Sequence, residues 1–148
     1  MPLSEILIIT SRRKKVMDDY FDREIELESV FEKEGKAEKL DLIKPHDAEI
    51  YFKRQTEMKG TGHALLQAGS FIGDNPFIVA YPDDLHFGDI PLAGQLVKKY
   101  EESGCSVMST LHNPPSLERY GVLAVDDNGY VKDIVEKPEQ GNEHTREA

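Results

Sequence analysis

The sequence has little cysteine, no tryptophan and no long apolar run. Cys105 is the only cysteine among 148 residues, so an internal disulfide is impossible and a reducing compartment is expected. Apolar runs such as Ile6–Ile9 fall far short of the roughly 20 residues that a membrane-spanning helix needs. The start, Met1–Glu5, lacks the basic segment and apolar stretch of a secretory signal. These absences predict a cytoplasmic protein with no membrane partner.

Positive charge is also in deficit. The chain has 18 Lys and Arg against 28 Asp and Glu, which gives a formal net charge of -10. This balance argues against nucleic acid as a partner, because clustered cations supply that attraction. Hydrophobic residues make up 39% of the chain, enough for a core. We therefore expect one domain over residues 1–148 with no internal linker.

Strands and helices alternate along the chain, which predicts an α/β fold. Two short helices are expected between Arg12 and Lys39, divided near Phe21-Asp22, with Gly35 ending the second or breaking it. Asn128-Gly129 between apolar runs predicts a β-hairpin of Tyr120–Val125 and Tyr130–Val135. The other expected strands are Ile6–Thr10, Ala48–Arg54, Phe77–Tyr81 and Ser106–Leu111, and the other expected helices are Thr61–Phe71 and Leu92–Glu102.

The first candidate site lies between a strand and a helix, at Gln55 and the run Lys59–Ala64. Gly60 and Gly62 would let a flat or anionic ligand approach the backbone. The Gln55 amide both donates and accepts hydrogen bonds, as recognition of a base edge requires. The alternative is that both glycines serve only a tight turn.

Two further candidates carry charge. Asp83 and Asp84 follow the expected strand Phe77–Tyr81, where a carboxylate could hold Mg²⁺ together with water and phosphate oxygens. The alternative is that Asp83 caps a turn. Glu136 and Lys137 end the hairpin, where a bend before Pro138 could bring a sugar-binding acid beside a phosphate-binding ammonium. The alternative here is a solvated charge pair.

The remaining polar residues receive no role. The five histidines, His63 among them, show no metal-ligand spacing. The charged run Arg12–Lys39 is interpreted as a solvated helical face.

The motifs, taken in order, resemble the sugar-phosphate nucleotidyltransferases, and within them the bacterial enzymes that transfer a uridylyl group to glucose 1-phosphate. The resemblance extends from about Ile6 to Pro138 and rests on seven motifs: Ile8-Ile9-Thr10, Tyr20-Phe21-Asp22 with Glu26-Leu27-Glu28, Arg54-Gln55, Lys59–Ala64, Pro82-Asp83-Asp84, Tyr120-Gly121-Val122 and Glu136-Lys137-Pro138.

The resemblance implies a Rossmann-like three-layer α/β/α sandwich with a mostly parallel sheet. It also implies that UTP and glucose 1-phosphate react to give UDP-glucose and pyrophosphate with Mg²⁺. In that family's terms the nucleotide would be bound by Gln55, Gly60, Gly62 and Asp84, the metal by Asp83, and the sugar phosphate by Gly121, Glu136 and Lys137.

The resemblance also implies parts that this sequence does not match. Relatives begin with a strand and a glycine-rich, cationic loop that holds the triphosphate, and they carry a second metal-binding Asp beyond Pro138. We therefore expect a central segment with no complete catalytic set, inactive by itself. The alternatives are a non-catalytic nucleotide- or sugar-phosphate-binding module and a structural fragment. Because Ile6–Thr10 and Phe77–Tyr81 are apolar on both faces, an open strand edge would favour a homo-oligomer.

Overall fold

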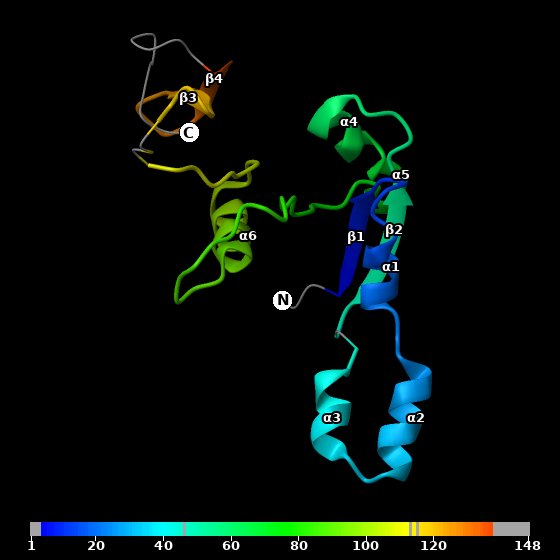
Figure 1. The fold of residues 1–148 in the computed structure, drawn as a ribbon. Helices are drawn as coiled ribbons and strands as arrows, with labels where there is room; N and C mark the ends of the chain where they lie inside the picture. Colours follow the sequence, from blue (N-terminus) through cyan, green and yellow to red (C-terminus); the bar gives the residue numbers. More distant parts are fainter. Residues whose placement is uncertain (1–3, 46, 113, 115, 138–148) are drawn as a thin grey trace. The chain divides into compact units, whose positions relative to one another are not determined.

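The computed structural model describes residues 4–45, 47–112, 114 and 116–137, and their contacts form two compact units, 1–77 and 78–148. The single-domain expectation stays a prediction. The first unit contains a pair of strands and several short helices, whereas the second contains one longer helix and a hairpin (Figure 1). No helix in the described residues is long and apolar enough to cross a membrane.

A parallel pair of strands forms the centre of the first unit. β1 (Glu5–Thr10) and β2 (Glu49–Arg54) pair in register from Glu5 opposite Glu49 to Thr10 opposite Arg54. Parallel strands need a long crossover, and here it contains three helices. These are α1 (Val16–Phe21), α2 (Ile25–Lys33) and α3 (Ala37–Leu42).

The helices of the crossover match the sequence prediction in part. The first two divide at Phe21-Asp22 as predicted, and Gly35 ends α2 in the left-handed conformation with φ +66°. The third helix was not predicted. It begins two residues after Gly35, because the glycine turns the chain and Ala37 starts a new run of helix-forming residues.

The predicted helix Thr61–Phe71 is two helices in the structure, α4 (Gly60–Leu66) and α5 (Gly69–Ile72). The backbone tightens between them, since Gln67 N–H donates to Ala64 O at 3.0 Å and Ala68 N–H donates to Leu65 O at 2.9 Å. Such three-residue bonds wind the chain more tightly than an α-helix and separate the two segments.

The second unit contains α6 (Leu92–Ser103) and an antiparallel hairpin of β3 (Gly121–Val125) and β4 (Val131–Glu136). Both predictions are confirmed here, and Gly104 ends α6 in the left-handed conformation. Val122 and Leu123 are buried. Ala68, Pro114 and Leu117 are buried as well.

Two predicted strands are wrong. Neither Phe77–Tyr81 nor Ser106–Leu111 forms a strand in the described structure. Phe77, Val79 and Tyr81 are 57%, 40% and 45% exposed. The two sheets formed by the described strands are β1 with β2 and β3 with β4, and neither of these runs is a strand of either sheet. The fold is α/β, and the three-layer sandwich stays a prediction.

Candidate functional site

Gln55 is held at the carboxyl end of β2 by bonds from its backbone and its side chain. Its backbone N–H donates to Thr10 O at 2.9 Å, which continues the parallel ladder by one residue. Its side-chain nitrogen lies 3.1 Å from Gly60 O and 3.0 Å from His63 Nδ1. The structure thus brings Gln55 and Gly60 together, as a shared base-binding loop requires.

Gly60 and Gly62 differ in their local geometry. Gly60 has φ +87°, which side chains rarely tolerate, so the backbone itself demands glycine there. Gly62 has no such φ, and a Cβ added to it would meet no described atom within 4 Å. Neither strain nor protein packing explains this second glycine. Open space above a glycine backbone is what the close approach of a ligand needs.

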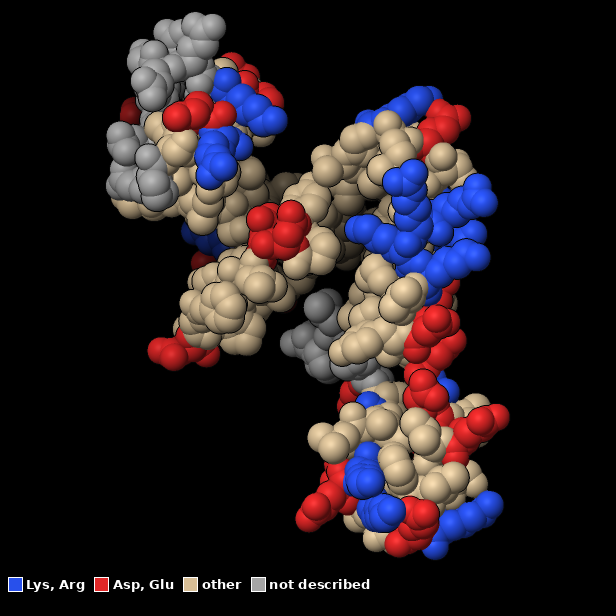
Figure 2. Space-filling view, viewed as in Figure 1, with Lys and Arg blue, Asp and Glu red and all other residues tan. Residues whose placement is uncertain are grey.

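Charge is distributed unevenly between the two ends of the β1–β2 pair. The exposed basic residues Arg12, Arg13, Lys14 and Lys15 follow β1, and Arg54 ends β2. Figure 2 shows Lys and Arg gathered over this part of the first unit. The sequence prediction treated this run as a solvated helical face, yet its first four residues lie at the same strand ends as Gln55. An anionic nucleotide is attracted to such a surface.

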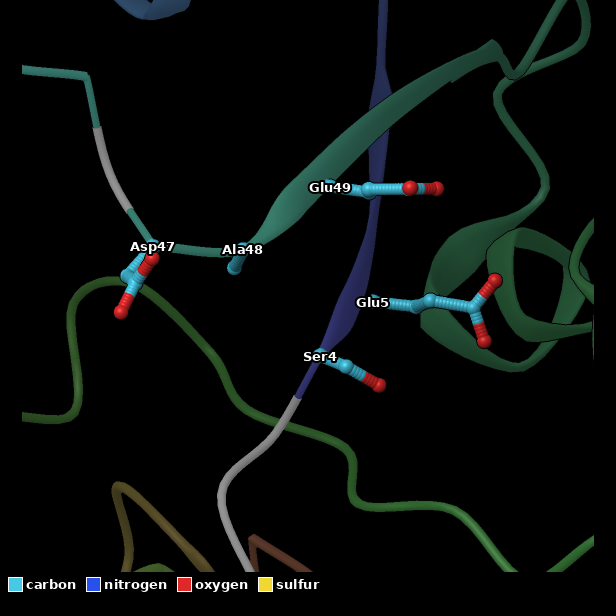
Figure 3. Close-up of a pocket in the computed structure, with 5 residues that line it drawn as sticks. All are labelled: Ser4, Glu5, Asp47, Ala48 and Glu49. Atoms are coloured by element: carbon cyan, nitrogen blue, oxygen red, sulfur yellow. The ribbon is translucent and has the colours of Figure 1, made fainter.

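The opposite end of the strand pair is acidic. A hollow of about 510 Å³ there is lined by Ser4, Glu5, Asp47, Ala48 and Glu49 (Figure 3). Tyr51 Oη donates to Glu49 Oε2 at 2.6 Å, and this bond raises the pKa of Tyr51. Carboxylates repel phosphates, and parallel sheets bind ligands at their carboxyl ends. The hollow is therefore not the candidate nucleotide site.

Asp83 and Asp84 lie in and just after an exposed turn of the second unit. Asp84 N–H donates to Tyr81 O at 3.1 Å, which closes the turn around Pro82 and Asp83. No group of three or more His, Cys, Asp and Glu side chains in the described part of the chain could hold a metal ion. Exposed carboxylate oxygen is nonetheless a suitable Mg²⁺ ligand when water and substrate phosphate complete the shell. Asp83 fits that donor chemistry.

The hairpin brings together the three residues predicted for the sugar phosphate. Gly121 pairs with Glu136 across the strands. A Cβ at Gly121 would lie 3.2 Å from Glu136 Oε2 and 3.3 Å from Ile134 Cγ2. Gly121 therefore leaves the room that the Glu136 carboxylate occupies.

Lys137 bends the chain at the end of β4. It is the one described non-glycine residue with positive φ, +47°, and its N–H donates to Tyr120 O at 2.9 Å. Its ammonium lies 3.9 Å from Glu136 Oε1, so the adjacent acid and base share one side of the chain. The predicted bend is thus confirmed, although Pro138 lies outside the described residues. Backbone strain at a charged residue is typical of functional positions.

Sequence reasoning missed His63. The residue was grouped with the unassigned histidines, yet its ring contacts the Gln55 amide. One signal was available, since His63 follows Gly60 by three residues, close to one helical turn, in the loop already singled out.

An α/β chain with a glycine-bearing loop after a parallel strand has an arrangement that many nucleotide-binding proteins share. Comparison with known proteins identifies the family, because the family model for nucleotidyl transferases matches residues 2–146. The chain belongs to this nucleotidyl transferase family.

Similar curated proteins come from staphylococci. The UTP–glucose-1-phosphate uridylyltransferase of Staphylococcus epidermidis is 41% identical over 146 residues, covering 94% of this chain and 51% of that protein. The Staphylococcus haemolyticus protein of the same name is 40% identical with the same coverage. The chain spans about half the length of the curated relatives that it matches.

Solved structures agree with this assignment. A UTP-bound UDP-glucose pyrophosphorylase (UGPase) from Acinetobacter baumannii matches with a TM-score of 0.85 and 27% identity, over 98% of this chain and 55% of that chain. A UDP-glucose pyrophosphorylase complexed with UDP-glucose matches with a TM-score of 0.77 and 29% identity, over 98% and 55%. The resemblance seen in the sequence is thus confirmed.

Proposed function

We propose that this chain is the part of a uridylyltransferase that binds the base of UTP and the sugar phosphate. The complete enzyme would form UDP-glucose and pyrophosphate from UTP and glucose 1-phosphate. The observation that carries the proposal is the 41% identity to a UTP–glucose-1-phosphate uridylyltransferase over 94% of this chain. The contacts of Gln55 with Gly60, and of Gly121 with Glu136, support it.

The reaction is a phosphoryl substitution. A phosphate oxygen of glucose 1-phosphate bonds to the α-phosphorus of UTP, and the bond from that phosphorus to the pyrophosphate oxygen breaks. Positioning and neutralisation of charge supply most of the rate enhancement in such a reaction. Mg²⁺, when bound, neutralises charge on the phosphates, and Asp83 is the residue that would hold it.

Each group of residues has its own task in this proposal. Gln55 and the backbone at Gly60 and Gly62 hold the base, with Asp84 as an orienting neighbour of Asp83 for the nucleotide. Glu136 accepts hydrogen bonds from sugar hydroxyls, and Lys137 meets the phosphate as a point charge. Gly121 keeps space for the Glu136 carboxylate. The substrates, the metal and the activity are proposed for the protein that contains the whole family domain.

Calorimetric titration of this chain with UDP-glucose, with ADP-glucose as the comparison ligand, tests the proposal. We expect UDP-glucose to bind preferentially and the Gln55→Leu variant to weaken binding about tenfold, since a hydrogen-bonding partner of the base is lost. Gln95→Leu is the matched control: its amide also donates to a backbone carbonyl five residues away, Ile90 O at 2.9 Å. Equal binding of the two sugar nucleotides would contradict the proposal.

A pyrophosphate-release assay on the same preparation separates binding from turnover. Selective UDP-glucose binding without turnover supports a binding segment, and we expect this result from the chain alone. Turnover at the rate of a complete uridylyltransferase would instead show that these residues suffice for catalysis.

A further inference from the structure

The hydrogen bonds around Gln55 fix which way its amide points. Gly60 O can only accept a hydrogen bond, so the Gln55 atom 3.1 Å from it must be the amide nitrogen. The same nitrogen lies 3.0 Å from His63 Nδ1. An amide NH₂ has two hydrogens and no acceptor capacity, so His63 Nδ1 must accept the second one. With Nδ1 as the acceptor, the ring proton of His63 lies on Nε2.

This arrangement leaves one group of the Gln55 side chain for a ligand. Both amide hydrogens are engaged by partners in the protein, and Oε1 accepts no hydrogen bond from the part of the chain that the structure describes. Gln55 is half-buried and directly follows β2, and the two bonds of its amide nitrogen restrict the orientation of its side chain. The group it presents is an acceptor.

We propose that His63 is a positioning residue that orients Gln55 to select a pyrimidine carrying a ring N–H. The inference rests on the proposed role of Gln55 in base binding. Uracil has an N3–H donor, which Oε1 can accept, whereas N3 of cytosine is itself an acceptor and would face Oε1 without a proton between them. Without His63 the amide can rotate and present N–H groups instead, and the discrimination falls.

The two acceptors of the Gln55 amide belong to the same helix. His63 belongs to α4, and its carbonyl oxygen accepts a 3.4 Å bond from Gln67 Nε2 one turn later. The helix begins at Gly60, whose carbonyl is the other partner of the Gln55 amide. One short helix thus supplies both acceptors, and moving either one changes the amide orientation.

The first test needs no ligand. Long-range ¹H–¹⁵N NMR spectra of the chain near neutral pH, with His63 assigned by the His63→Asn variant, report which ring nitrogen is protonated. We expect the proton on Nε2 and none on Nδ1. A proton on Nδ1 would overturn the inference, because that nitrogen could not then accept from Gln55.

The second test measures base selection. UMP, CMP and N3-methyl-UMP are titrated into the unchanged chain, His63→Leu and His63→Asn. Asn keeps an acceptor oxygen near the position of Nδ1, whereas Leu has none. We expect His63→Leu to bind UMP about three- to tenfold more weakly and to lose preference over CMP, while His63→Asn retains both. N3-methyl-UMP should bind the unchanged chain poorly.

The outcomes separate the two proposals. His63→Leu with unchanged UMP affinity and unchanged preference over CMP would overturn the positioning role, as would equal losses in His63→Asn and His63→Leu at unchanged melting temperature. If the unchanged chain binds no UMP, the proposed function and base selection both fail. The NMR result then decides separately whether His63 holds Gln55.

Discussion

Gly60 and Gly62 are two residues apart, but only Gly60 has a backbone conformation that requires glycine. Gly60 adopts φ +87°, so any side chain there strains the backbone. Gly62 faces open space and lies in the first turn of α4, where alanine is the better helix former. A glycine that the fold does not require is best explained by a ligand that needs its backbone.

The Gly62→Ala variant tests that explanation. We expect it to raise stability by about 0.5–1 kcal/mol, because alanine favours helix. We also expect UMP to bind at least about tenfold more weakly, because the new methyl group occupies the space of the base. Thermal unfolding and calorimetric titration measure the two effects.

Gly94→Ala is the matched control for this variant. Gly94 is also the third residue of its helix, α6, and a Cβ there also meets nothing within 4 Å. It should gain similar stability with no change in UMP affinity. If Gly62→Ala binds UMP as well as the unchanged chain does, the glycine loop is a turn and not a base site.

Lys137 combines a strained backbone with a charge. With φ +47° it lies in the left-handed region, which costs a non-glycine residue roughly 1–2 kcal/mol. Glycine at this position removes that cost and adds an entropic one of about 0.5–1 kcal/mol. Lys137→Gly should therefore be as stable as the unchanged chain or slightly more so, while losing affinity for glucose 1-phosphate.

Lys137→Ala separates the two properties, because it removes the ammonium and keeps the strain. Calorimetry should show that both variants lose affinity for glucose 1-phosphate to a similar extent. Lys137→Ala should be less stable than Lys137→Gly, because alanine keeps the strained backbone. Retained affinity in either variant would mean that the Glu136–Lys137 pair is merely solvated.

At the scale of elements, the hairpin turn is stabilised by one carboxylate. Asp126 Oδ1 accepts from Tyr130 N–H and Asn128 N–H, each at 3.0 Å, and Lys132 Nζ lies 3.3 Å from Oδ2. The hydrogen bond from Tyr130 N–H has the largest effect, and together these bonds hold the pKa of Asp126 below its ordinary value. The charged form therefore favours the folded hairpin.

The lowered pKa predicts acid sensitivity of this element. The stabilisation is complete above the ordinary aspartate pKa, near 4, and is lost as the pH falls through the lower folded pKa. NMR signals of the buried Val122 and Leu123, followed in urea between pH 7 and pH 2, measure the loss. Asp126→Asn should show a flatter pH dependence, because its amide oxygen accepts at every pH.

The exposed neighbour Asp127 gives the control, since Asp127→Asn should keep the acid sensitivity of the unchanged chain. Identical pH profiles for Asp126→Asn and the unchanged chain would show that this carboxylate does not stabilise the turn.

Local sequence signals predicted turns and helix ends well. They predicted poorly the elements that need a hydrogen-bonding partner from elsewhere in the chain. Gly35 and Gly129 were expected at a helix end and at a turn, and both have positive φ. The run Phe77–Tyr81 has strand-forming residues, but a strand also needs a hydrogen-bonding neighbour that no local pattern reveals. The contact of His63 with Gln55 also joins a helix to the end of a strand, and its one local signal was the three-residue spacing from Gly60.

At the scale of the whole molecule, many large apolar side chains are exposed. In the first unit Val16, Ile25 and Leu42 are 75%, 67% and 84% exposed, and in the second unit Phe87 is 87% exposed. Exposed apolar surface of this extent favours association. Light scattering over a range of concentrations should show a mass above that of one chain, decreasing on dilution. A single-chain mass at every concentration would contradict the homo-oligomer prediction.

The sequence singled out two groups of candidate residues whose members are neighbours in the structure. Gln55 lies beside Gly60, and Glu136 lies beside both Gly121 and Lys137, because a strand end and a hairpin are short-range features. The role proposed for Asp83 and Asp84 depends on a metal ion and on phosphates, which no local sequence pattern specifies.

The most direct measurement is NMR mapping of the isotope-labelled chain with UMP and, separately, with glucose 1-phosphate. UMP should shift the side-chain amide of Gln55 and the backbone amides of Gly60 and Gly62. Glucose 1-phosphate should shift Gly121, Glu136 and Lys137. The proposed binding residues are wrong if UMP leaves the NMR signals of Gln55, Gly60 and Gly62 unchanged. They are also wrong if the shifted signals belong to the acidic hollow around Glu5 and Glu49.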